Sequence, residues 1–428
     1  MNIPFTKKPR IVVVGGGFAG ISFIKNMRKV NVQIVLFDRH NYHTFQPLLY
    51  QVSTAGLEPD SIAYPLRKVF RKNNYFHFRL AEVEFIDTQK SEVLTSIGSI
   101  SFDYLVLATG TRTNFFGNKN IEVHSMPMKT IPQALNIRSL ILQNIEKADA
   151  SNDPLERKRL LNFVIAGAGP TGVELAGALA EFRKGILEND YPELQEDEME
   201  VHLMEGGSRV LSPMSESASK KAQRSLEKLG VVVHLNTLVS DFDGTQVTIK
   251  NGTHFNTETF IWAAGVTGAP VKGIDGSSLL EKLNRYRVDS FSRVAEFEHI
   301  FALGDIAFME TKNYPKGHPQ VAQPAMQQGR WLARNFKAAL KGKEMTPFTY
   351  FDKGTLATIG RNKAVADIRN MTFGGLFAWI LWMFVHLWFL VGFRNRAVTF
   401  FNWTYNYINY DRAARLIIRP FRKDPRQN

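Results

Sequence analysis

Gly15-Gly16-Gly17-Phe18-Ala19-Gly20, reached through Ile11-Val12-Val13-Val14, is the stretch of sequence that decides the fold. An apolar strand that breaks into Gly-x-Gly-x-x-Gly and then opens a helix is typical of a dinucleotide-binding unit. The first glycine permits the tight turn, the second lets a pyrophosphate approach the backbone, and the third lets helix and strand pack closely. The free N–H groups at the start of the helix then attract the phosphates.

The same pattern returns 152 positions later as Gly167-Ala168-Gly169-Pro170-Thr171-Gly172, after the apolar run Phe163-Val164-Ile165-Ala166. One such motif is a weak signal, because an ordinary Gly-rich turn can produce it. Two motifs, each between a strand and a helix, predict an α/β protein with two Rossmann-like units. Two dinucleotides bound side by side are the arrangement for moving electrons between them.

The first unit supplies a carboxylate where an adenosine ribose would lie. Asp38 ends the predicted strand 33–37 and follows Gly20 by 18 residues. A carboxylate at this place can accept hydrogen bonds from both ribose hydroxyls. The alternative is a plain acid in the turn at the end of a strand.

The second unit has its own acid, Glu205, at the end of the predicted strand 200–204. A carboxylate there favours NADH over NADPH, because it would repel a 2′-phosphate. Arg209 lies near enough to weaken that preference. The acid is 33 residues beyond Gly172, so we expect the acidic insert at 188–198 to lengthen the intervening helix.

Several further elements are predicted from the apolar pattern. Strand 104–110 ends in a small-residue turn, and the charged segment 145–160 suits a connector. The remaining predictions are a helix at 19–29, strands at 259–264, 299–305, 349–352 and 355–360, and a helix at 320–340.

Composition excludes several kinds of chemistry. The chain has 428 residues, enough for two or three domains, and no cysteine. Disulfides, thiolate zinc sites, iron–sulfur ligation and a redox-active cysteine pair are therefore excluded. The ten histidines show no metal-ligand spacing. Residues 1–10 lead directly into the first strand and do not resemble a signal peptide, which predicts a protein facing the cytosol.

Basic charge gathers at one end of the chain. The formal net charge is +13, and residues 361–428 hold 11 Lys/Arg against 3 Asp/Glu. Such a distribution predicts an acidic partner surface, either anionic lipid or nucleic acid. Because the chain has no nucleic-acid motif, we favour lipid.

The tail differs in kind from the rest of the chain. Residues 376–391 are uncharged and carry three tryptophans, and residues 398–418 mix aromatic side chains with arginines. A membrane-spanning helix needs about 20 apolar residues, and a buried core or dimer helix is a second interpretation. An interfacial helix pair, with Trp and Tyr at headgroup depth and Arg on the phosphates, is the third and the one we favour.

Together these residues resemble the type II NADH dehydrogenases, the single-subunit, non-proton-pumping NADH:quinone oxidoreductases. The resemblance covers nearly the whole chain. The two fingerprints alone are shared with many flavoproteins. More specific are the loop Phe45–Gln51, the stretch Ala322–Gly329, and the tail run His386-Leu387 with Phe393-Arg394-Asn395-Arg396.

The resemblance implies two dinucleotide-binding domains of the glutathione-reductase type. Residues 1–120 and 285–345 would form a domain that binds FAD non-covalently, and 155–270 would bind NADH as substrate. Residues 346–428 would form the quinone side and attach the enzyme peripherally to the cytoplasmic face of the cell membrane. A membrane quinone (ubiquinone or menaquinone) as acceptor, an anionic lipid surface and a homodimer are also implied.

Site residues follow from the same resemblance. Glu174 matches a carboxylate near flavin and nicotinamide that relays protons, and its alternative is a helix-start acid. Gln323 and Gln327 match positions between flavin and quinone, although a polar helix face would look the same, and Lys363 matches the quinone end. The cofactor-binding positions are Gly15, Gly16, Gly17, Phe18, Ala19, Gly20, Asp38, Arg39, Phe45, Gln46, Pro47, Val83, Ala108, Thr109, Gly110, Gly304, Asp305, Ala322, Gly167, Gly169, Pro170, Thr171, Gly172, Glu205 and Gly265.

Two other functions remain open from the residues alone. One is a soluble flavin reductase that serves a small iron–sulfur protein, and the other is a nucleotide-sensing flavoprotein of the apoptosis-inducing type. A sulfide:quinone reductase is rejected, because its sulfur chemistry needs cysteines.

Overall fold

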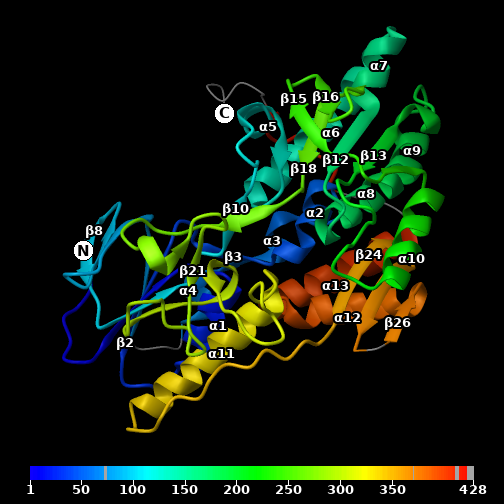
Figure 1. Ribbon diagram of the computed structural model, residues 1–428. Coiled ribbons are helices and arrows are strands. Elements are labelled where there is room, and N and C mark those ends of the chain that lie inside the picture. The colour runs from blue at the N-terminus through cyan, green and yellow to red at the C-terminus, as the bar shows by residue number, and fades with distance from the viewer. Residues whose placement is uncertain (72–74, 370, 410–413, 422–428) are drawn as a thin grey trace. The chain divides into compact units, whose positions relative to one another are not determined.

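The computed structural model describes residues 1–71, 75–369, 371–409 and 414–421 (Figure 1). The chain divides into two compact units. Unit 1 comprises Met1–His43, Tyr64–Arg112 and Val266–Asp352, and unit 2 comprises Thr44–Ala63, Thr113–Gly265 and Lys353–Asn428.

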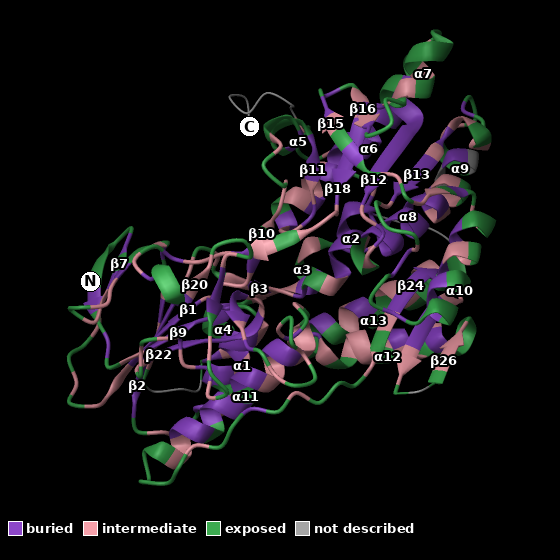
Figure 2. Cartoon of the chain, viewed as in Figure 1, coloured by how far each residue is buried: buried purple, intermediate pink, exposed green. Residues whose placement is uncertain are grey.

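Unit 1 is built on a five-stranded sheet with the order β22-β9-β1-β2-β5. All neighbours in it are parallel, so both faces must be covered, and the interiors of the central strands are apolar, whereas the edge strand β5 also carries His77 and Arg79. Figure 2 shows β1, β2, β9 and β22 as largely buried. The strands are β1 (Arg10–Val14), β2 (Gln33–Asp38), β5 (Phe76–Leu80), β9 (Tyr104–Leu107) and β22 (Ile300–Ala302).

Two helices of unit 1, α1 (Phe18–Asn26) and α11 (Ala322–Ala339), lie side by side (Figure 1). Gly329 allows their close approach, because a Cβ there would lie 2.4 Å from the Ala19 carbonyl oxygen. The smaller elements are α4 (Leu66–Val69), β6 (Val83–Asp87), β7 (Glu92–Thr95), β8 (Gly98–Ser101), β10 (Thr111–Thr113), β19 (Val266–Gly268), η4 (Gly276–Ser278), β20 (Leu279–Leu280), β21 (Arg285–Arg287), η5 (Gly304–Ile306) and β23 (Ala307–Phe308), with β3 (Tyr42–Thr44) and β4 (Ala63–Pro65) at the unit boundary.

Unit 2 repeats the parallel design with the order β11-β18-β12-β13-β14. The strands are β11 (Met126–Pro127), β12 (Asn162–Ala166), β13 (Glu200–Met204), β14 (Val231–His234) and β18 (Thr259–Trp262). An antiparallel sheet joins β15 (Val239–Phe242), β16 (Gln246–Ile249) and β17 (His254–Asn256). The helical elements are η1 (Gln46–Leu48), α2 (Leu49–Ser53), α3 (Pro59–Ile62), α5 (Lys119–His124), α6 (Ile131–Ala150), α7 (Pro154–Leu161), α8 (Pro170–Phe182), η2 (Arg183–Leu187), α9 (Glu188–Asp190), η3 (Glu196–Glu198) and α10 (Glu216–Lys228).

The C-terminal part of unit 2 is a three-stranded antiparallel sheet followed by two helices. The strands are β24 (Thr355–Gly360), β25 (Lys363–Ile368) and β26 (Met371–Gly374), and the helices are α12 (Leu376–Phe389) and α13 (Phe393–Asn409). None of the described helices is long and apolar enough to cross a bilayer.

The predicted strands 11–14, 33–37 and 200–204 are confirmed within one residue. The predicted strand 349–352 is wrong. The Phe351 N–H in this stretch donates to the Gln327 side chain, and the Phe348 N–H just before it donates to the Ser290 carbonyl, so neither group takes part in strand pairing.

Some predicted helix boundaries also move. The helix predicted at 19–29 ends at Asn26, and the one predicted at 320–340 is α11. The acidic insert does not simply lengthen α8: a π-helical turn, η2, follows Phe182, and short pieces complete the connection. The second tail helix begins at Phe393 rather than 398, and residues 410–413 of that prediction lie outside the described residues.

Candidate functional site

The first fingerprint turn requires its outer glycines. Gly15 has φ +105°, and a Cβ there would lie 2.3 Å from the Ala108 carbonyl oxygen. At Gly20 a Cβ would lie 2.0 Å from the Gly15 carbonyl oxygen. These close approaches explain why β1, the turn and α1 accept only glycine at both ends of the motif.

The middle glycine leaves open space at the start of α1. No atom lies within 4 Å of a Cβ built on Gly17. Gly17 is also the N-cap, and no side chain caps the helix. The first N–H groups of α1 therefore lack the side-chain acceptor that usually satisfies them, which suits an anionic pyrophosphate.

The second fingerprint has the same geometry. Gly167 has φ +99°, and a Cβ on Gly172 would lie 1.9 Å from the Gly167 carbonyl oxygen. Gly169 is the uncapped N-cap of α8, with no atom within 4 Å of its Cβ position. Pro170 and Thr171 open α8, and Pro170 suits the first helical turn because its missing N–H would have no partner there.

Each turn is tied to the acid at the end of the neighbouring strand. Asp38 accepts the Gly16 N–H through Oδ2 at 2.6 Å and the His40 N–H through Oδ1 at 2.7 Å. Glu205 accepts the Ala168 N–H through Oε2 at 2.8 Å and the Gly207 N–H through Oε1 at 2.7 Å. The two predicted ribose carboxylates thus hold equivalent places in equivalent frameworks.

Other predicted flavin-side positions gather around the first turn. The Thr109 Oγ1 is buried with no hydrogen-bond partner among the described residues, a polar atom that a bound group would satisfy. A Cβ on Gly304 would lie 3.3 Å from the Ala19 Cβ, so the end of β22 approaches the fingerprint. Asp305 comes next and lies 3.4 Å from the Thr111 hydroxyl, which donates to its Oδ2.

Gln328 was not a predicted site residue, yet its buried side-chain amide supports this site. Its Oε1 accepts the Gly304 N–H at 2.6 Å and so fixes the turn that carries Asp305. Sequence reasoning missed this role, since Gln328 lies beside the predicted glutamines without a distinguishing pattern.

The remaining predicted cofactor positions lie on several different elements. Ala108 and Gly110 flank Thr109 after β9, and Arg39 is exposed after β2. Val83 begins β6, and Ala322 begins α11.

The predicted glutamines belong to the first turns of α11 in unit 1. The side-chain amide of Gln327 makes two hydrogen bonds to the backbone of Phe351. Its Nε2 donates to the Phe351 carbonyl at 2.8 Å, and its Oε1 accepts the Phe351 N–H at 3.1 Å. Gln327 thus holds the chain that follows Tyr350. Gln323 lies half-buried one turn earlier. Their placement between flavin and quinone stays a prediction.

Glu174 is a buried acid on α8. Burial raises the pKa of its carboxyl to about 8, although the backbone N–H of Thr358 and the indole of Trp382 oppose the rise. The Thr358 N–H donates to Oε1 at 3.4 Å. A carboxyl with this pKa is protonated at pH 7 and can exchange its proton near neutrality.

An aromatic stack lies beside this acid in unit 2. The Trp382 and His386 rings stack with centroids 4.1 Å apart, and the Phe45 ring meets His386 edge-on at 6.1 Å. The His386 Nδ1 donates to the Trp382 carbonyl at 2.7 Å. Burial lowers the pKa of His386 to about 4, so this imidazole is neutral at pH 7. The sequence offers two signals here, the i,i+4 spacing of Trp382 and His386 and the tail run His386-Leu387, but neither predicts that the two rings stack.

The predicted loop 45–51 is packed in the same unit. Phe45 is buried, and Gln46 and Pro47 begin η1. Lys363 begins β25, where it pairs with Gly360 and is half-buried. The structure thus brings Glu174, Phe45 and Lys363 into one compact unit, whereas the two glutamines belong to the other.

The tail is fastened to the segment that follows this loop. The buried Asn395 amide donates to the carbonyl oxygens of Asp60, Ser61 and Ala63 at 2.9, 3.1 and 2.8 Å. The Asn395 bonds hold α13 on α3, and Trp403 Nε1 donates to the Gln51 Oε1 in α2 at 2.7 Å.

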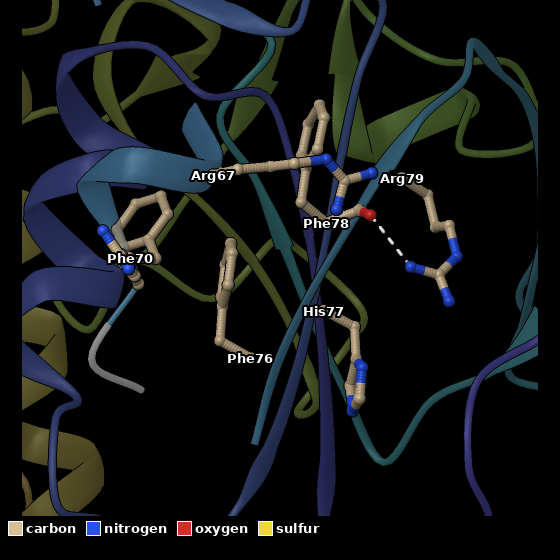
Figure 3. A pocket seen from close by; sticks show the side chains of 7 residues that line it. Arg67, Phe70, Phe76, His77, Phe78 and Arg79 are labelled. Carbon is tan, nitrogen blue, oxygen red and sulfur yellow. Dashed lines mark hydrogen bonds between the residues drawn. The ribbon is translucent and has the colours of Figure 1, made fainter. Parts of the chain in front are cut away.

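A separate pocket of about 200 Å³ lies in unit 1 between α4 and β5 (Figure 3). Arg67 extends across Phe78, with its guanidinium carbon 5.0 Å from the ring centre. The pocket contains no predicted site residue, so it is not counted among the dinucleotide sites. Its lining residues are Arg67, Phe70, Arg71, Phe76, His77, Phe78 and Arg79.

Comparisons with known proteins agree with this arrangement. Residues 9–329 match the family model described as pyridine nucleotide-disulphide oxidoreductase, and residues 353–409 match the NDH2 C-terminal domain. The chain is 36% identical over 425 residues to the type II NADH:quinone oxidoreductase NdhA of Mycobacterium tuberculosis, covering 95% of this chain and 89% of that one. It is 28% identical to the type II NADH:quinone oxidoreductase of Haemophilus influenzae, covering 84% and 87%.

Solved structures share the fold. NDH2 from Plasmodium falciparum in complex with NADH superposes with a TM-score of 0.88 at 21% identity, covering 96% of this chain and 100% of that one. The sulfide:quinone oxidoreductase from Aquifex aeolicus superposes with a TM-score of 0.71 at 19% identity, covering 93% and 95%. The predicted fold class, two dinucleotide-binding domains with a C-terminal segment, is confirmed.

Proposed function

The chain belongs to the type II NADH:quinone oxidoreductases, and we propose that it oxidises NADH and reduces a membrane quinone, with FAD as a non-covalent cofactor and without pumping protons. One observation carries the proposal. Two uncapped glycine turns, each bonded to a strand-end carboxylate, lie in two separate parallel sheets. A protein with one nucleotide substrate and no second dinucleotide would not need both.

The residues of unit 1 fit FAD. The turn Gly15–Gly20 and the start of α1 would hold its pyrophosphate, Asp38 its adenosine ribose and Asp305 its ribitol, with the orphan Thr109 hydroxyl alongside. When bound, the flavin supplies hydride acceptance and two-electron donation, chemistry that protein side chains lack.

The residues of unit 2 fit NADH. The turn Gly167–Gly172 would hold its pyrophosphate, and Glu205 would face its adenosine ribose. Both oxygens of Glu205 accept backbone N–H groups, so the carboxylate is fixed in place. A 2′-phosphate beside it would meet a fixed negative charge, which supports NADH as the preferred substrate.

Quinone reduction consumes two protons, and Glu174 is positioned to hold one. Its carboxyl, with a pKa of about 8, is neutral at pH 7 and can donate at Oε1 or Oε2 and then take up another proton. The buried indole of Trp382 interacts with this carboxyl and stacks on His386, and we expect the pair to limit access of water to the acid. Lys363 is proposed at the quinone end of this region.

The tail supports a lipid-dissolved substrate. Buried Ala378 and Trp382 lie on one side of α12, whereas other apolar side chains of α12 and α13 are exposed. The exposed ones are Leu376, Phe377, Ile380, Phe384, Trp388, Phe393, Phe400, Phe401 and Ile408. An exposed apolar face of this kind suits an interfacial helix pair, with the arginines on anionic headgroups. We place this face on the cytoplasmic leaflet and expect a homodimer.

Steady-state NADH oxidation with matched ubiquinone and menaquinone analogues, with the bound flavin identified by its absorption spectrum, tests the proposal. We expect a flavin spectrum, NADH-dependent bleaching and turnover with at least one quinone. Bleaching without quinone turnover would favour the soluble flavin reductase, and slow turnover with any acceptor would favour the nucleotide-sensing flavoprotein.

A further inference from the structure

The side chain of Phe116, an exposed aromatic residue of unit 2, lies near the end of β18. Phe116 is 68% exposed, and its backbone has φ +51°, a left-handed conformation that is unfavourable for a residue with a Cβ. Burial therefore cannot account for this ring. A strained backbone that presents a large apolar group to solvent calls for a ligand or partner.

The short segment that carries Phe116 is firmly held. The Asn114 N–H donates to the Gly265 carbonyl at 3.1 Å, and the Trp262 Nε1 donates to the Asn114 carbonyl at 2.8 Å. The Phe116 N–H donates to the Asn114 Oδ1 at 2.8 Å, and Phe115 stacks on Trp262. The exposed ring is thus presented by a built support rather than by a loose loop.

The ring of Phe116 lies over Gly265. A Cβ on Gly265 would be 3.0 Å from the Phe116 Cζ, so the missing side chain leaves room for the ring. Gly265 directly follows Ala264, whose Cα would be 2.6 Å from a Cβ on Gly167. Phe116 therefore flanks the second fingerprint turn, because the glycine under its ring is the residue next to the one that contacts that turn, just beyond the end of β18.

Sheet order decides which half of a dinucleotide would meet Phe116. β12 lies between β13 and β18, all three are parallel, and their carboxyl ends share one edge. With the pyrophosphate on the turn after β12, Glu205 at the end of β13 faces the adenosine ribose. The other half must then extend over the end of β18, which is where Gly265 and Phe116 lie.

We propose that Phe116 is the apolar face against which the nicotinamide half of the dinucleotide lies. This inference rests on the proposed NADH site and adds a substrate-contacting residue to it. The flat ring can pack on the nicotinamide, and its π-face attracts the positively charged pyridinium of NAD⁺. The strain at Phe116 is then part of a site preorganised for the substrate.

Two probes separate the halves of the ligand. NAD⁺ carries the nicotinamide, whereas ADP-ribose has the same adenosine, pyrophosphate and second ribose without it. Titration calorimetry on the flavin-loaded full chain gives the dissociation constant for each. We expect Phe116→Ala to weaken NAD⁺ binding about tenfold and ADP-ribose binding less than about twofold. Phe116→Tyr, which keeps the ring, should retain NAD⁺ affinity.

Leu155→Ala is the matched control, because Leu155 is a similarly exposed apolar residue of unit 2 in the first turn of α7. Gly265→Ala is an independent second variant that displaces the ring, and it should give the same selective loss of NAD⁺. An equal loss for both probes, or no loss for either, overturns the inference while leaving NADH oxidation by the wild type intact. A wild-type protein that binds neither probe overturns the proposed function and this inference together.

Discussion

Gly177 and Ile359 approach each other so closely that a Cβ on Gly177 would lie 1.6 Å from the Ile359 carbonyl oxygen. This contact sets β24 directly on α8. It lies one helical turn from Glu174 and one residue from Thr358, whose N–H reaches the Glu174 carboxyl. The absence of a side chain at Gly177 therefore allows Thr358 to lie beside the Glu174 carboxyl.

Gly177→Ala should force β24 away from α8. We expect a loss of about 1–3 kcal/mol in the free energy of unfolding, read as a lower Tm, together with slower quinone reduction. Gly56→Ala is the control for unfolding, since a Cβ there would have only an ordinary contact of 3.4 Å. Equal Tm values for the two variants would mean that the close approach does not constrain the packing.

The pH dependence of Glu174 has a definite sign. Its pKa is raised from 4.5 to about 8 in the folded protein, so the folded state holds one more proton than the unfolded state between those values. The stability contributed by this group is therefore fully present below pH 4.5 and is lost as pH rises toward 8, by roughly 1.4 kcal/mol for each pH unit crossed. The Tm of the wild type relative to Glu174→Gln should fall across this window.

The same variant tests the proton role. Quinone reduction in Glu174→Gln should fall about 10²-fold and lose the dependence on an apparent pKa near 8, while NADH still bleaches the flavin. Stopped-flow absorbance resolves the two half-reactions. A wild-type rate for quinone reduction in this variant would remove Glu174 from proton transfer.

Glu205→Ser is expected to raise the use of NADPH relative to NADH, because it removes the fixed negative charge that a 2′-phosphate would meet. We expect the ratio of kcat/KM values to shift about tenfold. Asp241, an acid on β15, gives a control as Asp241→Ser. If the ratio stays at its wild-type value, Glu205 does not lie in the NADH site.

Substitution of exposed side chains of α12 tests the membrane contact without removing buried side chains from the core. Phe377→Ser, Phe384→Ser and Trp388→Ser combined should release the protein from anionic vesicles in flotation assays, because each substitution removes apolar area from the bilayer contact. The matched control replaces Phe5, Val123 and Leu155, which are also largely exposed apolar residues but lie outside the tail. Vesicle binding that survives the α12 triple change would contradict an interfacial tail.

Local pattern was enough for much of the fold. The glycine turns and the acids Asp38 and Glu205 lie within one strand–turn–helix–strand unit, so their spacing is visible in the sequence. Thr358 is different: it meets Glu174 across 184 positions, and only the close approach at Gly177 brings them together. His386, Gln328 and Phe116 were likewise out of reach, because their roles depend on neighbours that no short-range periodicity encodes.

The fastening of Asn395 to Asp60, Ser61 and Ala63 changes how a truncated chain should be understood. The tail and the loop after Phe45 are parts of one folded body, so removing the tail also removes the scaffold of that loop. Loss of quinone turnover in a shortened protein would therefore reflect the lost support of residues 60–63 as well as the lost contact with the bilayer. Exchanging tails between relatives would demand that residues 44–63 be exchanged with them.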